Sequence, residues 1–444
     1  MSVKNSYLTL QGHILNSFCC LPAIIQKNVE IAKEFESIDK PAAILSASML
    51  KHTGIAQRRY AQNDEASSDL IIKAVQATSI TLTDITAVVV ATTSGDCPSP
   101  ATSHFVHAGL KLQENVHCFD VASSCSSFLS ALRSAFGVMM TSQKHVMVAA
   151  SEVKNKGLPK TDLRTRSLFG DGAAGLLLKQ KENNDNYDFF YFCHEESNTK
   201  IIHNIIIPVG GSKAPTTIEN IHKNKLFLNQ PKETYAIIVK ALIKAIEKSW
   251  AERTELLKSM NENAPETIPC TIFVHQANKN ILKEVKQKIN SKLSHKVPIL
   301  MTDIGNTVCA SLPILRTRFL FLKSIIFFEN NFVTKNELLN YFKLLCQKTN
   351  KFSYTNKNNG IIFKAFFANE IIEIFDEGCT SIDNCWLQQI DSDEYLEILF
   401  LLKDMHFTCN EKVTRIKYLD IWITAGGGFQ TVALLHGKIN TFTS

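Results

Sequence analysis

One cysteine lies where an expected strand passes into an expected helix, and its surroundings suit a nucleophile. An apolar strand is expected over Val116–Val121 and a helix from Phe128 onward, so Cys125 falls in the first turn of that helix. Unpaired backbone N–H groups and the dipole at a helix start favour negative charge, so we expect a lowered pKa for this thiol. The small residues around it leave room for a substrate beside the sulfur. The segment predicts an acyl-transfer enzyme.

Three other segments place a functional group or bare backbone at a strand end, where α/β proteins build their sites. His275 ends an apolar strand, Asn306 follows Gly305 in a tight turn, and a glycine run centred on Gly427 follows another strand. Taken singly, such residues are more often structural, as turn formers or packed side chains. A glycine run can nevertheless aim backbone N–H groups at an oxyanion. Their occurrence together with Cys125, in this order, favours a catalytic site.

The elements that must position these residues alternate between strand and helix. This alternation indicates an α/β fold with largely parallel sheets covered on both faces. The predicted strands are Ala87–Thr92, Val116–Val121, His145–Ala150, Ala174–Leu178, Thr271–Val274 and Tyr418–Thr424. Residues 120–133 also resemble residues 303–316 in register, each running from a strand end into a helix. Two related halves with paired central helices, or a chance likeness between small-residue turns, explain this repeat equally well.

Composition limits the other classes of function. The chain has 444 residues, 45% of them hydrophobic, and a mean hydropathy of −0.02, which is typical of a globular protein with more than one domain. The net charge is +6 and the basic residues form no runs, so nucleic-acid binding is not favoured. No signal peptide and no membrane span are expected, because no apolar run reaches ~20 residues. Twelve scattered cysteines indicate free thiols in a reducing, cytoplasmic compartment.

Residues 318–415 differ from the rest, being rich in Phe, Lys and Asn and poor in Gly. The span is too long for an ordinary loop, so we expect an inserted subdomain of unknown role. We expect helices over Asn336–Cys346 and Asp393–Lys403, with Ile361–Phe375 as either strand or helix. The expected domains are 1–180 with the cysteine, 181–317 together with 416–444 carrying His275, Asn306 and the glycine turn, and the insertion.

These motifs resemble β-ketoacyl-acyl-carrier-protein synthase III, the initiating condensing enzyme of fatty-acid synthesis in the thiolase-like superfamily. The matching segments are Thr53–Ile55 with Arg58, Val88–Ser94, Asp120–Cys125, Leu168–Ala173, His275–Asn278, Gly305–Thr307 and Gly426–Phe429. They span nearly the whole chain except the insertion. The resemblance implies a thiolase-like fold of two duplicated α/β halves in a layered α-β-α-β-α core. It also implies a homodimer without a metal or redox cofactor, acting on substrates linked to coenzyme A or to the phosphopantetheine of acyl carrier protein.

The resemblance further implies a mechanism. Cys125 would attack an acyl thioester and hold the acyl group, with the backbone N–H groups of Cys125 and Gly427 stabilising the oxyanion. His275 and Asn306 would hydrogen-bond the carbonyl of a malonyl unit and stabilise the enolate that forms as carbon dioxide leaves. Two other outcomes stay open: acyl transfer to an alcohol or amine without condensation, or a non-catalytic partner subunit of another synthase. The intact set of Cys125, His275 and Asn306 favours condensation, in fatty-acid or specialised lipid or polyketide synthesis.

The chain departs from the family at its expected substrate entrance. Ser48 and His52 stand where members commonly carry a tryptophan and an arginine that grip the adenine of coenzyme A. Either an acyl-carrier donor replaces coenzyme A, or Arg58 and the neighbouring Arg59 compensate. Ser99 stands where some members place a bulky aromatic residue across the dimer. We therefore expect an acyl chain larger than acetyl.

Asn280 stands where the family often has an arginine for docking the carrier protein. Lys279 and Lys283 are four residues apart on one helix face, so they either replace that arginine or are ordinary surface lysines. The candidate substrate-binding residues are Ser99, Phe169, Arg58, Asn278 and Lys279.

Overall fold

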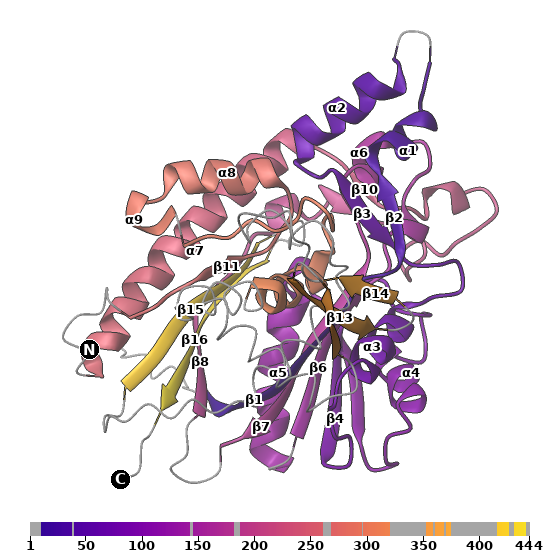
Figure 1. Ribbon diagram of the computed structural model, residues 1–444. Coiled ribbons are helices and arrows are strands. Elements are labelled where there is room, and N and C mark those ends of the chain that lie inside the picture. Colours follow the sequence, from indigo (N-terminus) through magenta and orange to yellow (C-terminus); the bar gives the residue numbers. More distant parts are fainter. Residues whose placement is uncertain are drawn as a thin grey trace. The chain divides into compact units, whose positions relative to one another are not determined.

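A mixed sheet of nine strands runs through the larger of the two units into which the chain divides (Figure 1). This unit comprises Met1–Arg316 and Asn410–Ser444, and the smaller unit comprises Thr317–Cys409. The computed structural model describes residues 10–37, 40–142, 145–181, 187–260, 268–294, 296–319, 352–357, 360–367, 370–373, 415–425 and 430–440. Among these residues, no helix is long and apolar enough to cross a membrane.

The sheet has the strand order β11-β15-β16-β8-β1-β7-β6-β4-β5. Its strands are β1 (Leu10–Cys20), β4 (Ile85–Ala91), β5 (His117–Val121), β6 (His145–Glu152), β7 (Gly172–Gln180), β8 (Tyr187–Ser197), β11 (Ile272–Val274), β15 (Arg415–Ala425) and β16 (Gln430–Asn440). The short strands β2 (Ile24–Lys27) and β3 (Gln57–Tyr60) pair separately, as do β9 (Ile205–Ile206) and β10 (Phe227–Leu228). All six strands predicted from the sequence are present, within a few residues of the expected bounds.

The helices of this unit are α1 (Asn28–Lys33), α2 (Ala42–Thr53), α3 (Ser67–Gln76), α4 (Thr102–Gly109), α5 (Ser127–Ser142), α6 (Leu163–Arg166), α7 (Pro231–Ser259), α8 (Lys279–Lys288) and α9 (Ser291–Ser294). A further helix begins at residue 311 and is described to residue 319. Local signals in the sequence bound several of them. Gly54 ends α2 with a φ of 72°, and Pro231 opens α7.

The sheet repeats one pairing pattern in two halves. β4 is parallel to β6, β6 is antiparallel to β7, and β7 is antiparallel to β1. The strands β11, β15, β16 and β8 follow the same succession of orientations, and β1 joins β8 at the centre of the sheet. The prediction of duplicated α/β halves is thereby confirmed.

The expectation of a largely parallel sheet is wrong. Among the described strands, only β4–β5, β4–β6 and β11–β15 pair in parallel. The antiparallel strands β7 and β16 are nevertheless buried along most of their length, as a parallel strand would be. Because helices cover both faces of this sheet, an unbroken apolar run does not distinguish the two orientations.

Each half has its own hydrophobic core. In the first half, α3 packs on the sheet through Leu70, Ile71 and their neighbours, against Val88, Val90 and Met147. In the second half, α7 and α8 pack against β11, β15 and β16. These helices fix the strand ends, and the residues picked out from the sequence lie at those ends.

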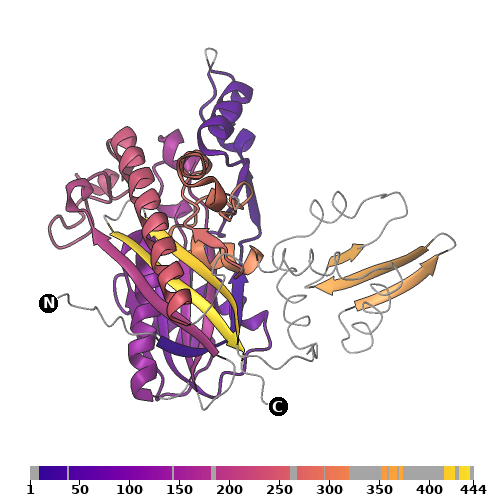
Figure 2. The same ribbon diagram turned by 90° about the vertical axis from the view of Figure 1, so that its left-hand side faces the viewer.

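The smaller unit contains an antiparallel sheet of β12 (Phe352–Lys357), β13 (Gly360–Phe367) and β14 (Glu370–Glu373), drawn in orange in Figure 2. The run Ile361–Phe375 is therefore strand where it is described. The helices expected at Asn336–Cys346 and Asp393–Lys403 lie outside the described residues. The expected boundary between residues 1–180 and 181–317 stays a prediction.

Candidate active site

Cys125 lies in a single 3-10 turn, η1 (Ser124–Ser126), between the end of β5 and the start of α5. Ser124 adopts a left-handed φ of 54°, which is uncommon for serine. The Oγ of Ser127 stabilises this conformation, because it accepts from the N–H of Ser123 (2.8 Å) and donates to the carbonyl of Ser124 (2.7 Å). The Cys125 side chain is a thiol, not part of a disulfide, and it is half-buried. The expected position at the start of a helix is confirmed.

Asn306 sits in a loop whose backbone is tied to the chain before β7. Its N–H donates to the carbonyl of Leu168 (2.9 Å), and its carbonyl accepts from the N–H of Gly170 (3.1 Å). The side-chain Oδ1 of Asn306 accepts from the N–H of Val308 (2.9 Å). The amide oxygen is therefore occupied, so the group that Asn306 offers to a ligand is the N–H donor.

Hydrophobic packing brings the Asn306 loop to Cys125. Phe169 and Val308 belong to one buried cluster, against which Cys125 packs. The turn η6 (Val308–Ala310), which opens the helix at residue 311, also contacts η1. The predicted substrate residue Phe169 thus lies between the two loops that carry Cys125 and Asn306.

The ends of β15 and β16 reach the same place. The Oγ of Ser126 donates to the carbonyl of Gln430 (3.1 Å), and the Oγ1 of Thr424 donates to Ser126 Oγ (3.1 Å). Gly427 lies outside the described residues, between these two strands. The residues that flank its turn are therefore hydrogen-bonded to the neighbour of Cys125.

His275 follows β11, and its backbone N–H donates to the carbonyl of Ile423 on β15 (2.9 Å). Its side chain is 1% exposed, and neither ring nitrogen has a partner among the described residues. Burial lowers the pKa of His275 from 6.5 to about 4. The imidazole is consequently neutral at pH 7, with one N–H to donate and one nitrogen to accept.

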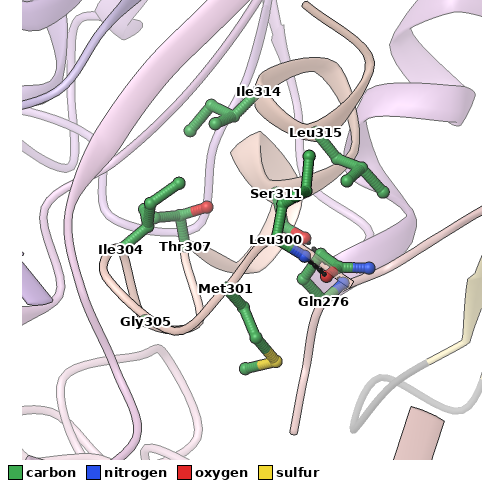
Figure 3. Close-up of a pocket in the computed structure, with 9 residues that line it drawn as sticks. All are labelled: Gln276, Leu300, Met301, Ile304, Gly305, Thr307, Ser311, Ile314 and Leu315. Atoms are coloured by element: carbon green, nitrogen blue, oxygen red, sulfur yellow. Dashed lines mark hydrogen bonds between the residues drawn. The ribbon is translucent and has the colours of Figure 1, made fainter. Parts of the chain in front are cut away.

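A small pocket is lined by residues next to Asn306 in the sequence, with Gln276 and Leu315 on one side and Ile304 and Thr307 on the other (Figure 3). The residues that line it are Gln276, Leu300, Met301, Ile304, Gly305, Thr307, Ser311, Ile314 and Leu315. Gln276 accepts from the N–H of Leu300 (2.9 Å), and its own N–H donates to Ser311 Oγ (2.8 Å). The three candidate catalytic side chains are absent from the lining. The pocket therefore lies beside the loop that carries Asn306, not at the thiol.

Arg58 is fully buried. Its guanidinium donates to Asn28 Oδ1 (2.7 Å), to the carbonyl of Ser167 (2.8 Å) and to the carbonyl of Gln26 (3.2 Å). Burial lowers its pKa to about 10. A Cβ built on Gly305 would lie 2.9 Å from the Arg58 Cβ, so this arginine packs directly under the Asn306 loop.

The remaining candidates lie apart from the thiol. Ser99 is exposed, in the loop between β4 and α4. Asn278 caps α8 by accepting from the N–H of Asn280 (2.8 Å) and donates to the carbonyl of His52 (3.2 Å). Lys279 Nζ donates to Thr302 Oγ1 (3.3 Å). The family's docking position, Asn280, donates to the carbonyls of Lys51 (3.0 Å) and His52 (2.9 Å) at the end of α2.

The internal repeat is real, but its register is wrong by one residue. Val308 has a φ of 48°, matching Ser124, and the turns η6 and η1 each lead directly into a helix. Cys309, and not Val308, is therefore the counterpart of Cys125. Sequence comparison missed this because the second segment carries one extra residue before its turn, and an ungapped comparison cannot show it.

Sequence reasoning also missed residues that hold the site together. Thr424 was placed at a strand end without a role, and Glu152 was not singled out. Their signal is position, since both lie at the end of a buried strand, as His275 does. Among the described residues, no group of three His, Cys, Asp or Glu side chains could hold a metal ion.

Known proteins resemble this chain in sequence. A family model described as 3-oxoacyl-[acyl-carrier-protein (ACP)] synthase III matches residues 119–195. Over 302 residues the chain is 31% identical to a β-ketoacyl-[acyl-carrier-protein] synthase III from Aliarcobacter butzleri, covering 66% of this chain and 84% of that protein. A protein of the same name from Koribacter versatilis is 28% identical over 271 residues, covering 60% of this chain and 78% of that protein.

The fold is also that of solved structures. The crystal structure of a 3-oxoacyl-(acyl-carrier protein) synthase from Burkholderia xenovorans matches with a TM-score of 0.62 at 18% identity, covering 98% of this chain and 96% of that one. This likeness confirms the expected thiolase-like fold. With the sequence identity to curated relatives over most of their length, it leads to one assignment: the chain belongs to the β-ketoacyl-acyl-carrier-protein synthase III family.

Proposed function

We propose that this chain is an acyltransferase that forms a β-ketoacyl thioester by decarboxylative condensation, with Cys125, His275 and Asn306 as its catalytic residues. The observation that carries the proposal is the convergence of three segments distant in sequence. Cys125 packs on Val308, two residues after Asn306. Its neighbour Ser126 is hydrogen-bonded to Thr424 on β15, the strand that also accepts a hydrogen bond from the backbone of His275. Membership of the family supports the same chemistry.

In the first half-reaction, the Cys125 thiolate attacks the carbonyl carbon of an acyl thioester. The negative charge moves to the carbonyl oxygen, where the N–H groups of Cys125 and Gly427 stabilise it. The C–S bond to the donor then breaks, and the donor leaves as a thiolate, which takes up the proton that the Cys125 thiol released. The acyl group is now bound to Cys125.

In the second half-reaction, a malonyl thioester binds with its carbonyl oxygen facing His275 and Asn306. Carbon dioxide leaves, and the electron pair of the broken C–C bond forms an enolate that both side chains stabilise by donating hydrogen bonds. The enolate carbon attacks the acyl carbon on Cys125, and the C–S bond breaks to return the thiolate. The product is a β-ketoacyl thioester, lengthened by two carbons.

The environment of His275 suits this role better than that of a proton carrier. A pKa near 4 keeps the ring neutral at pH 7, so it donates through one N–H without competing for a proton. Asn306 is likewise a neutral donor, since Val308 occupies its oxygen. Two neutral donors can stabilise an enolate without first binding the malonate carboxylate as an ion pair.

We infer that the acyl donor is carried on acyl carrier protein. Arg58 and Arg59 are buried, and Arg58 already donates to three protein groups, so they do not replace the residues absent at Ser48 and His52. The Asn280 side chain donates to a backbone carbonyl at the end of α2, so it is not available to a carrier protein. Of the two candidate lysines on α8, Lys279 donates to Thr302, and the exposed Lys283 is available to a carrier. Free thiols among the described cysteines support a reducing, cytoplasmic location.

We infer a homodimer from the free edge of the sheet. Among the described strands β5 is the last in the order and is only partly buried, so its outer backbone groups are placed to pair with a strand of a second copy. Phe105 on the adjacent α4 is 37% exposed. A second copy paired along β5 would cover both and would bring Ser99 close to the dimer interface.

Intact-mass measurement tests the proposal. The protein is incubated with octanoyl-coenzyme A or octanoyl-carrier protein, and then with malonyl-carrier protein. We expect an acyl adduct from the carrier donor that is absent in Cys125→Ala, and its discharge with release of carbon dioxide. Discharge by amines or alcohols alone would mean that the chain forms amides or esters instead, and an adduct in Cys125→Ala would exclude Cys125 as the nucleophile.

Substitution of Ser99 tests which length of acyl chain the enzyme accepts. We expect the natural protein to load octanoyl more readily than acetyl, and Ser99→Phe to reverse that preference by reaching across the dimer and filling the space beside the acyl group of the second copy. A natural protein that loads acetyl and refuses octanoyl would contradict the inference.

A further inference from the structure

A second cysteine occupies the place of Cys125 in the other half of the molecule. Cys309 is the middle residue of η6, as Cys125 is of η1, and the two turns are in contact. The surroundings of the two thiols differ. Cys125 is half-buried, whereas Cys309 is completely enclosed.

Cys309 is held by hydrogen bonds that keep it from acting as a second nucleophile. Its Sγ lies 3.1 Å from Glu152 Oε1 and 3.3 Å from the carbonyl oxygen of Ala91. Burial raises the pKa of this thiol well above its usual value, and Glu152 and the nearby Cys125 raise it further. Cys309 therefore remains protonated and acts as a hydrogen-bond donor.

The acceptor, Glu152, is a fully buried carboxylate with an unusually complete set of donors. The N–H and hydroxyl of Thr93 donate to it (3.1 and 2.9 Å), as does the hydroxyl of Ser94 (2.5 Å). Lys154 lies 3.2 Å away and also donates to Thr93 Oγ1 (2.5 Å). This network fixes Glu152 at the ends of β4 and β6, so the carboxylate is a rigid anchor for whatever binds it.

Two hydrogen bonds connect Glu152 to the loop that carries Asn306. Cys309 ties η6 to Glu152, and η6 begins at Val308, whose N–H holds the oxygen of Asn306. An amide that turned by half a rotation would present its oxygen, not its N–H₂, to the enolate. The position of Val308 therefore determines whether Asn306 stabilises or repels the developing charge.

We propose that Glu152 and Cys309 are positioning residues for Asn306, and that they act on the decarboxylation half-reaction and not on acyl transfer to Cys125. The proposal rests on the function proposed above. Glu152 keeps its other donors when Cys309 is replaced, so the substitution leaves no buried charge without a partner. The thiol can thus be removed without removing the anchor.

The test measures the two half-reactions separately. Cys309→Ala removes the donor, and Cys309→Ser keeps a donor of similar size. Cys193→Ala is the matched control, because Cys193 is also a buried thiol, 2% exposed, that donates to Ser249 Oγ (3.2 Å) away from the site. Acyl loading is followed by intact mass with octanoyl-carrier protein, and decarboxylation by the release of labelled carbon dioxide from malonyl-carrier protein.

We expect Cys309→Ala to slow decarboxylation about tenfold, which is roughly the value of one hydrogen bond to a charged group. Acyl loading should change less than about twofold, and Cys309→Ser should restore decarboxylation. Equal losses in both half-reactions, no loss in Cys309→Ala, or the same selective loss in Cys193→Ala would overturn the proposal. A natural protein that fails to load or to decarboxylate would instead refute the proposed function, so the two failures are distinguishable.

Discussion

Gly305 is the residue at which a single methyl group should do most harm to the candidate site. Its φ of 83° lies in the left-handed region, which costs a non-glycine residue about 1–2 kcal/mol. A Cβ there would also lie 2.9 Å from the Cβ of Arg58, which is buried and held by its own hydrogen bonds, so neither can move freely. Together these effects predict that Gly305→Ala lowers the free energy of unfolding by about 2 kcal/mol or more.

Gly137 provides the matched control for this prediction. It lies within α5, it is exposed, and a Cβ built on it meets no atom within 4 Å. Gly137→Ala should therefore stabilise the protein by roughly 0.5–1 kcal/mol, because alanine is the better helix former. Thermal unfolding of the two variants and the natural protein measures the difference, with about 2 °C or more expected between Gly305→Ala and the natural protein.

The same variant tests whether the loop matters to chemistry. Displacing Gly305 displaces Asn306, so decarboxylation should fall more than acyl loading of Cys125. A Gly305→Ala protein that unfolds at the temperature of the natural one would refute the reasoning on strain. A destabilised variant with unchanged decarboxylation would refute the role given to the loop.

Two further predictions follow from hydrogen bonds and charge. The pKa of His275 is about 4 in the folded protein and near 6.5 in the unfolded chain. Between these pH values the unfolded chain binds more protons. The free energy of unfolding therefore falls as the pH drops through that window, by up to about 3 kcal/mol. Urea unfolding at pH 7 and pH 4.5 should show a smaller loss for His275→Gln than for the natural protein, and parallel losses would contradict this cause. Asn280→Ala removes two bonds to the end of α2, so hydrogen exchange over residues 42–53 should become faster, and unchanged exchange would mean that these bonds do not hold α2 to α8.

The sequence was most informative where chemistry and strand ends coincide. Cys125 and His275 follow the strands β5 and β11, where α/β proteins place functional groups, whereas Asn306 lies in a loop that is bridged to Phe169. The structure places the first at a helix start, as expected, and brings the loops of Cys125 and Asn306 together through Phe169. The spacing of apolar residues could not show which neighbouring strands pair in parallel and which pair antiparallel. Both faces of the sheet are buried, so its antiparallel strands lack the alternation of apolar and polar residues that would identify them.

Arg58 illustrates a different failure of prediction. The family resemblance makes Arg58 a candidate for gripping coenzyme A in place of the residues absent at Ser48 and His52, yet the structure buries it under the loop of Asn306. Charge indicates exposure only on average, and an arginine is enclosed where backbone carbonyls satisfy its donors. Those carbonyls belong to residues 26 and 167, which are distant in sequence, so no local pattern could reveal them.

The two cysteine turns show how a duplicated fold can divide one task. Both halves build the same turn, with a left-handed residue followed by a cysteine and a helix. In the first half the thiol is left half-exposed, where a substrate can reach it. In the second half it is enclosed and tied to Glu152, and the residue before it holds the Asn306 amide. Although the two turns touch, the anchor acts on the second: Glu152 holds Cys309, and through Val308 it determines which group Asn306 presents to the enolate.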